Sequence, residues 1–344
     1  MVGEIRERNV VIDVIKAFAI ISVIVGHSIQ YGFSDAYLES KAYFDNSIFK
    51  IIYSYHMPLF MLISGYLFGF SIDRDWRGIV KKRSWNLLVP IFVWGAIKTI
   101  KFIILQVADD DFSVAETCFY FLRKSVLHLW FLWALFLCTI LILVVNRLFK
   151  DSLLVYISIF AVSFLIPDVM NLGLYKFMYP YFLIGYLYNV KGWQKRVVPY
   201  CNIKLLLLLG VIFIILLQFY SYDSYIYTSG HCVWGKDIIN QMSINFYRYI
   251  IGFIGSCFVI LLFYFLIEQR GMHMPFLAYV GKVTMGIYIM ESLLLFPEIV
   301  KSMHEVNYWV VAIESLYRMT VCLLIINLIK KTKTLNRLLL GVQS

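Results

Sequence analysis

The sequence is short of charged residues. Asp, Glu, Lys and Arg supply 15% of its 344 residues, whereas an average soluble domain has about 25%. Hydrophobic residues supply 61%, and this is more apolar surface than a single core surrounded by water can bury. The shortage of charge therefore excludes an ordinary soluble protein, and lipid must be the solvent for much of the chain.

The sequence also lacks paired cysteines and internal repeats. Its six cysteines show no Cys-x-x-Cys spacing, which argues against a structural zinc site or a disulfide scaffold. Only Cys118 and Cys232 fall in segments expected outside the membrane, so they form the one candidate disulfide. The net charge of +10 arises from clusters between apolar runs, and we expect no nucleic-acid partner. No fixed-period repeat is present, which excludes a solenoid.

Apolar runs of membrane-spanning length recur along the whole chain. The first run holds Asp13, Lys16 and His27 without a small-residue cleavage site, so we expect a retained helix and not a signal peptide. The sequence predicts an all-α, polytopic integral membrane protein with about ten transmembrane helices, forming one domain over residues 1–344 and no soluble domain. The expected spans lie near residues 10–30, 49–70, 86–107, 128–146, 152–167, 174–190, 203–221, 244–267, 275–296 and 309–329.

The distribution of basic residues predicts the orientation of these spans. If the N-terminus is cytoplasmic, the inside segments hold most of the Lys and Arg, while the acidic residues 109–111 fall outside. We therefore expect N- and C-termini in the cytoplasm, together with the link 71–85. Residues 31–48, 108–127 and 222–243 are expected outside.

Ionisable side chains inside a span are costly, so each one is a functional candidate. Lys16 and His27 are eleven residues apart in the first span, which places them on one helix face about 16 Å apart along the axis. A long, thin ligand could contact both residues. The alternative is a snorkelling lysine beside a histidine that is satisfied in the protein core, and the spacing alone leaves both interpretations open.

Three histidines, His27, His56 and His128, are expected at one depth in the outer half of the membrane. A pKa of about 6.5 suits histidine to accept a hydroxyl proton at neutral pH. Three histidines are also a conceivable zinc set, but no His-x-x-x-His or His-Glu-x-x-His motif is present, so we predict no metal. Glu291, late in the ninth span, reaches the same layer and is a candidate to orient a histidine base. Its alternative is a solvated carboxylate at a helix end.

Two charge clusters have a structural and a functional interpretation. Polybasic segments beside a membrane often anchor the chain or contact anionic lipids, but guanidinium and ammonium groups also bind phosphate-rich ligands. Glu314 and Arg318, four residues apart in the last span, resemble a self-neutralising pair. The polybasic segment is the link between the second and third spans, with Arg74, Arg77, Lys81, Lys82 and Arg83.

Taken together, six segments resemble acyltransferase family 3, whose members are membrane-bound acyltransferases of bacterial cell-surface glycans and related acceptors. The resemblance implies a ten-helix core in the bacterial cytoplasmic membrane. It also implies transfer of an acyl group, usually acetyl, from cytoplasmic acyl-CoA to a hydroxyl of a cell-surface saccharide or its precursor. The segments are IDVIKAFAIISVIVGHS (12–28), HMPLFMLISGYLFG (56–69), KKRSWNLLVP (81–90), HLWFLWALF (128–136), YFLIGYLY (181–188) and VGKVTMGIYIMES (280–292).

Position by position, the resemblance assigns the family's basic residue to Lys16 and its key histidine to His27. Lysine in place of the commoner arginine keeps the charge and loses the bidentate fork. The family's Arg-x-x-Arg falls on Arg83 and Asn86, so one cation is missing. Glu291 stands where relatives often carry a histidine.

The resemblance supplies the acyl-CoA donor that the residues alone do not reveal. We expect Lys16, Lys82 and Arg83 near the nucleotide phosphates, with the pantetheine arm running along the face from Lys16 to His27. His27, with Glu291, is the predicted catalytic base. Whether the acyl group passes directly or through an acyl-histidine stays open. The predicted acceptor side comprises His56, His128, Trp130, Tyr288 and the aromatic outer loop with Tyr222, Tyr225, Tyr227 and Trp234.

The rival function is a transporter or flippase of a small polar or glycolipid substrate, which also needs polar residues inside the membrane. Such folds often contain inverted repeats and interrupted helices in matching halves, and the sequence displays neither pattern. A scaffold without chemistry is the third alternative. Dependence of activity on His27 and binding of acyl-CoA distinguish the three.

Overall fold

The computed structural model describes residues 8–31, 42–109, 112–293 and 307–342, and every regular element in these ranges is a helix. The first half comprises α1 (Val10–Tyr31), η1 (Ala42–Asp45), α3 (Ser47–Gly69), α4 (Trp76–Arg83), η2 (Ser84–Leu88), α5 (Val89–Ala108), α6 (Val114–Leu127), α7 (Trp130–Phe149) and α8 (Leu153–Ser163). The second half comprises α9 (Leu172–Val190), α10 (Gln194–Val197), η3 (Val198–Tyr200), α11 (Ile203–Leu217), η4 (Tyr222–Ser224), α12 (Ile226–Ser229), α13 (Ile238–Tyr264), η5 (Phe265–Gln269), α14 (Pro275–Lys282), α15 (Thr284–Leu293), α16 (Tyr308–Lys330) and α17 (Lys333–Leu340).

Six helices in the described ranges are long and apolar enough to cross a membrane. The bent pair of residues 194–200 and α11, whose arms meet at 91°, counts as a seventh if it forms one broken span. The prediction of an all-α chain with several membrane-spanning helices is confirmed at this level, and six or seven candidate spans in the described ranges stand against the ten predicted. The six are α1, α3, the continuous α4 to α5 segment, α7, α13 with η5, and α16.

The other predicted spans coincide with helices that are short, broken or less apolar. Helix α8 has 11 residues, which is a length of about 16 Å against roughly 30 Å of hydrocarbon. Helix α9 carries Lys176 and Pro180, and the span predicted at 275–296 is divided between α14 and α15 at Val283. The last three residues of that span lie outside the described residues. Helix α13 begins six residues before the predicted start at 244.

The centre of the molecule is a close packing of α3 against α9, with α1 and α13 alongside. Gly65 and Gly185 make this packing backbone to backbone. A Cβ added at Gly65 would lie 1.9 Å from the carbonyl oxygen of Phe182, and one at Gly185 would lie 2.0 Å from that of Leu62. The two glycines therefore let α3 and α9 approach more closely than any larger residue allows.

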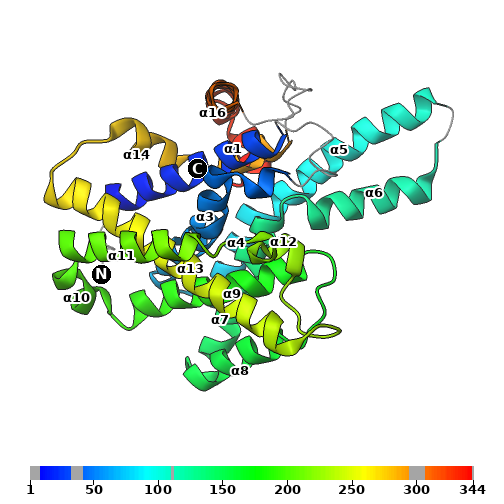
Figure 1. The fold of residues 1–344 in the computed structure, drawn as a ribbon. Helices are drawn as coiled ribbons and strands as arrows, with labels where there is room; N and C mark the ends of the chain where they lie inside the picture. The colour runs from blue at the N-terminus through cyan, green and yellow to red at the C-terminus, as the bar shows by residue number, and fades with distance from the viewer. Residues whose placement is uncertain (1–7, 32–41, 110–111, 294–306, 343–344) are drawn as a thin grey trace.

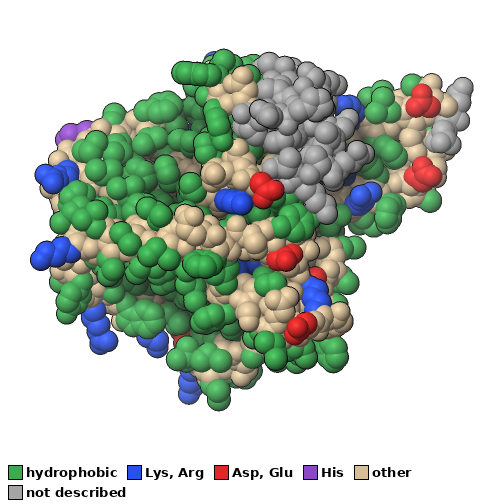
Figure 2. Space-filling model, viewed as in Figure 1, with side chains coloured by type: hydrophobic (Ala, Val, Ile, Leu, Met, Phe, Trp, Pro, Cys, Tyr) green, Lys and Arg blue, Asp and Glu red, His purple; other side chains and the backbone are tan. Residues whose placement is uncertain are grey.

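Hydrophobic side chains cover most of the visible face of the molecule (Figure 2). Lys and Arg stand along its left and lower edges and also among the Asp and Glu side chains on its right (Figure 2). The α5–α6 hairpin projects from the remaining helices on the right (Figure 1). All six cysteines are free; Cys118 is exposed on α6 and Cys232 is buried, so the candidate disulfide is not formed.

Candidate catalytic site

His27 and Glu291 are brought together by α1 and α15. The imidazole Nδ1 lies 2.8 Å from Glu291 Oε2. A carboxylate only accepts hydrogen bonds, so Nδ1 carries the proton and Nε2 is left as the acceptor nitrogen. The His27 side chain is 25% exposed and that of Glu291 only 1%. The geometry is that of a histidine base held in one tautomer by a buried carboxylate, which is the arrangement expected from the sequence.

Arg318 on α16 joins this pair and was not predicted to do so. Its Nη1 lies 3.2 Å from Glu291 Oε1, the carboxylate oxygen that does not face His27. The same guanidinium binds Glu314 Oε1 through Nε at 2.9 Å and also through Nη2. The sequence revealed the Glu314–Arg318 pair by its four-residue spacing, but the link to Glu291 is a tertiary contact that spacing does not reveal.

His56 lies close to the pair from α3. It is buried, and its Nδ1 donates to the carbonyl of Ile52 at 2.7 Å, which leaves Nε2 as the acceptor nitrogen. His56 is near enough to His27 for an electrostatic interaction. His128 instead meets Lys98, whose ammonium lies 2.6 Å from its Nε2. In the described ranges no three His, Cys, Asp or Glu side chains are grouped as metal ligands.

Tyr288 and Trp130 place the start of α7 beside α15. The hydroxyl of Tyr288, three residues before Glu291, accepts a hydrogen bond from the backbone N–H of Phe131 at 3.3 Å. The Phe131 ring packs against both Tyr288 and Trp130, at centroid distances of 5.7 and 5.9 Å. Tyr288 also interacts electrostatically with Glu291. Of the predicted acceptor side, His56 therefore interacts electrostatically with His27, and Tyr288 with Glu291.

A basic cavity of about 400 Å³ lies at the link between α3 and α5. Lys82 and Arg83, two of the three residues predicted near the donor phosphates, line it together with Arg74 of the same polybasic link. Lys16 is not among the lining residues; its Nζ pairs with Asp13 at 2.9 Å. The lining comprises Ser71, Arg74, Asp75, Gly78, Ile79, Lys82, Arg83 and Asn86.

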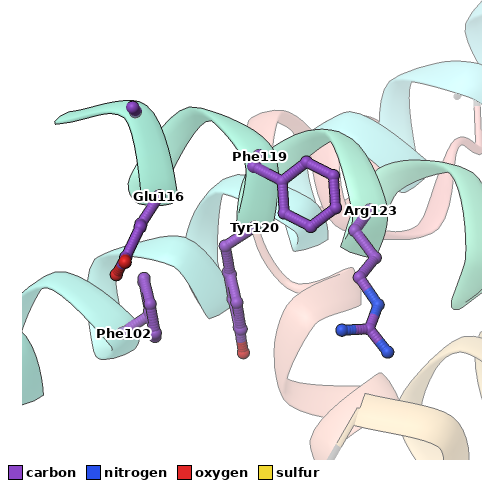
Figure 3. Close-up of a pocket in the computed structure, with 6 residues that line it drawn as sticks. Phe102, Glu116, Phe119, Tyr120 and Arg123 are labelled. Atoms are coloured by element: carbon purple, nitrogen blue, oxygen red, sulfur yellow. The ribbon is translucent and has the colours of Figure 1, made fainter. Parts of the chain in front are cut away.

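A second, shallower cavity of about 480 Å³ lies between α5 and α6, away from every predicted site residue. The rings of Phe102 and Tyr120 stack at 4.1 Å, and Glu116 and Arg123 stand at its two ends (Figure 3). It is an open groove on the projecting hairpin, with apolar and charged side chains.

The predicted aromatic outer loop, residues 222–243, is held beside the start of α3 by hydrogen bonds and an ion pair. Tyr225 donates to the carbonyl of Phe44 at 2.9 Å, and buried Arg248 donates to the carbonyls of Ser224 and Gly230. Burial by itself favours a higher pKa for Asp168, but the backbone N–H groups of Cys232 and His231 and the Lys176 ammonium outweigh it and hold the pKa below its usual value. These hydrogen bonds and the ion pair hold the loop in one defined conformation.

Comparison with known proteins gives one family and two relatives. A family model described as an acyltransferase domain matches residues 9–339. The chain is 30% identical over 245 residues to Nodulation protein NolL of Mesorhizobium japonicum, covering 70% of this chain and 64% of that protein. It is 35% identical over 190 residues to Nodulation protein NolL of Sinorhizobium fredii, covering 53% of this chain and 49% of that protein. The chain thus spans less than two thirds of either relative, and no solved structure matches it.

Proposed function

The chain belongs to acyltransferase family 3, whose model covers it almost from end to end, and on that premise we propose that it is a multi-pass membrane acyltransferase. It transfers an acyl group, with acetyl as the expected group, from cytoplasmic acyl-CoA to a hydroxyl of a cell-surface saccharide or its precursor. The observation that carries the proposal is the contact of His27 with buried Glu291 at 2.8 Å. The family's key histidine thereby has what a general base needs, a fixed tautomer and a carboxylate that stabilises its charged form.

The proposed reaction balances with these two residues. Nε2 of His27 takes the proton of the acceptor hydroxyl as the hydroxyl oxygen attacks the thioester carbonyl carbon. The new C–O bond forms, the C–S bond breaks, and the CoA thiolate leaves. His27 then gives its proton to the sulfur, so the products are the acylated acceptor and CoA. Glu291 holds the imidazole throughout and stabilises its positive charge.

The donor phosphates fit the basic cavity at the α4 link. Arg74, Lys82 and Arg83 supply three cations around a space of about 400 Å³, and such groups are the natural binders of phosphate. Asn86, which stands at the family's second arginine position, also lines this cavity. Arg74 therefore supplies a cation to a cavity that lacks the family's second arginine. Lys16, about 16 Å along α1 from His27, marks the path along which the pantetheine arm reaches the base.

The acceptor enters from the opposite side of the membrane. His56, which interacts with His27, and Tyr288, which interacts with Glu291, are the groups that receive its hydroxyl. His128, Trp130 and the fastened aromatic loop form the outer approach. Aromatic faces and neutral histidines suit a saccharide, which offers C–H faces and hydroxyls instead of charge.

The donor and acceptor sides require a definite topology. We infer ten spans with both termini cytoplasmic, in the bacterial cytoplasmic membrane. The concentration of Lys and Arg in the segments expected inside supports this orientation, because cytoplasmic loops carry the excess of Lys and Arg. Helices α8, α9, α11 and the α14–α15 pair supply the spans beyond the six that are long and apolar by themselves.

Purified protein in proteoliposomes tests the proposal. With acetyl-CoA and a panel of mono- and oligosaccharides, we expect release of the CoA thiol and acylated sugar in amounts that match. Acetyl-CoA should also bind in the absence of any saccharide. Protein that neither binds acetyl-CoA nor releases thiol, but moves a labelled saccharide across the bilayer, would instead be the transporter.

A further inference from the structure

Glu314 and Arg318 extend the catalytic pair into a line of four ionisable groups. In order they are His27, Glu291, Arg318 and Glu314, and each contacts the next at hydrogen-bond distance. They come from three helices, because α1 carries the histidine, α15 the first carboxylate and α16 the other two groups. Helices α1, α15 and α16 pack together in the fold (Figure 1).

Burial makes this arrangement energetically significant. The side chains of Glu291, Arg318 and Glu314 are 1%, 6% and 5% exposed, and charges in such a place are weakly screened. A buried arginine between two carboxylates is no general aid to stability, since apolar residues of similar size often do as well. Its position beside the carboxylate that holds His27 therefore points to a role in the chemistry.

Resting on the proposed function, we infer that Glu314 and Arg318 are positioning residues that act on His27 through the Glu291 carboxylate. Arg318 holds Glu291 Oε1, so that Oε2 stays aimed at Nδ1 of His27. Arg318 also offsets part of the Glu291 charge, which keeps the imidazole neutral and ready to act as a base. Glu314 in turn offsets part of the Arg318 charge, so that Glu291 still stabilises the imidazolium once His27 has taken a proton.

The sum of the charges explains why both residues are needed. Over these four groups the formal charge is −1 with a neutral His27 and zero with a protonated one. Without Arg318 the negative charges of Glu291 and Glu314 are no longer offset, which favours the charged form of the imidazole. Without the Glu314 charge, the cation beside Glu291 is unopposed and His27 is a weaker base. Other titratable groups in electrostatic contact with this line include His56 on α3, Tyr288 on α15 and Cys322 on α16.

The test is the pH dependence of kcat for three variants, measured as thiol release from acetyl-CoA with the saccharide that serves the wild type best. Glu314→Gln removes a buried negative charge, so Arg318 is unopposed and His27 becomes a weaker base. The acidic limb of the profile should move to lower pH by about one unit, and the plateau should fall. Arg318→Gln should move the limb the other way, with activity recovered at alkaline pH. The double variant restores the balance of charge, so its limb should return towards that of the wild type.

Two controls separate this role from a structural one. Cys322 interacts electrostatically with Glu291 and Arg318, so Cys322→Ala, which removes no charge, should leave the acidic limb in place. Folded protein is quantified by size-exclusion chromatography for every variant. If Arg318→Gln does not fold, the acidic limb of Glu314→Gln is compared with that of the double variant, and a difference between the two limbs supports the inference. Identical acidic limbs in Glu314→Gln, the double variant and the wild type would overturn the inference while the proposed function stands. Absence of thiol release by the wild type would overturn the proposed function itself, and this inference with it.

Discussion

His27 and Arg318 bind opposite oxygens of one carboxylate, that of Glu291, at 2.8 and 3.2 Å. The first residue stands near the beginning of the chain and the second near its end. Only the packing of α1 and α16 against α15 brings them to one group. The Glu291 carboxylate therefore joins residues that lie near opposite ends of the sequence.

The basic cavity predicts a specific loss of donor affinity. Replacing Lys82 and Arg83 together by alanine removes two lining cations, so acetyl-CoA should bind more weakly, with a smaller dependence on salt. The matched control is Arg77→Ala with Lys81→Ala, which removes the same charge from α4 at positions outside the lining. Calorimetric titration measures both variants. Equal losses in the two would mean that the cluster acts only through its overall field or as a lipid anchor.

Native cysteines report the topology. Cys118 is exposed on α6, in a segment expected outside, so a membrane-impermeant maleimide should label it in intact cells. Cys201, between η3 and α11 and partly exposed, should be labelled only after permeabilisation. Cys118→Ser and Cys201→Ser identify each signal by mass spectrometry. The reverse pattern would place the basic cavity outside and remove the proposed cytoplasmic donor from reach.

The α3–α9 contact predicts a large packing effect from one methyl group. Gly65→Ala puts a Cβ 1.9 Å from the Phe182 carbonyl, so the helices must separate, at a cost of about 1–3 kcal/mol. Gly210→Ala is the control, because there the new Cβ lies 3.1 Å from the flexible Phe258 ring. Thermal unfolding in detergent should show a clear fall in Tm for the first variant and little change for the second. Equal Tm values would contradict the close approach.

Much of this site was predictable from sequence because depth in a membrane can be counted along a helix. Counting placed His27, His56 and Glu291 in one layer, and the structure brings the first two into electrostatic contact and joins His27 to Glu291. Counting does not reveal which side chains meet between helices. The contact of Arg318 with Glu291 was missed for that reason, as was the contact of His128 with Lys98.

The fold was predictable in class and less so in detail. Composition required membrane helices, but an apolar run looks the same whether its helix is straight or bent. The 91° break before Ile203 and the division at Val283 depend on packing, so the ten predicted spans are not ten single helices. Helix α6 was predicted only as an outer segment, because its charges gave no spanning signal.

The central claim is that His27 is the base, and His27→Gln tests it most directly. Glutamine keeps the size and some hydrogen bonding to Glu291 but cannot take the proton, so kcat per folded molecule should fall by about 10² to 10⁴. Binding of acetyl-CoA should persist, since the cavity lining does not include His27. Measured together in proteoliposomes, near-complete loss of kcat with retained donor affinity is the predicted result. A His27→Gln protein that transfers the acyl group at the wild-type rate would contradict the account.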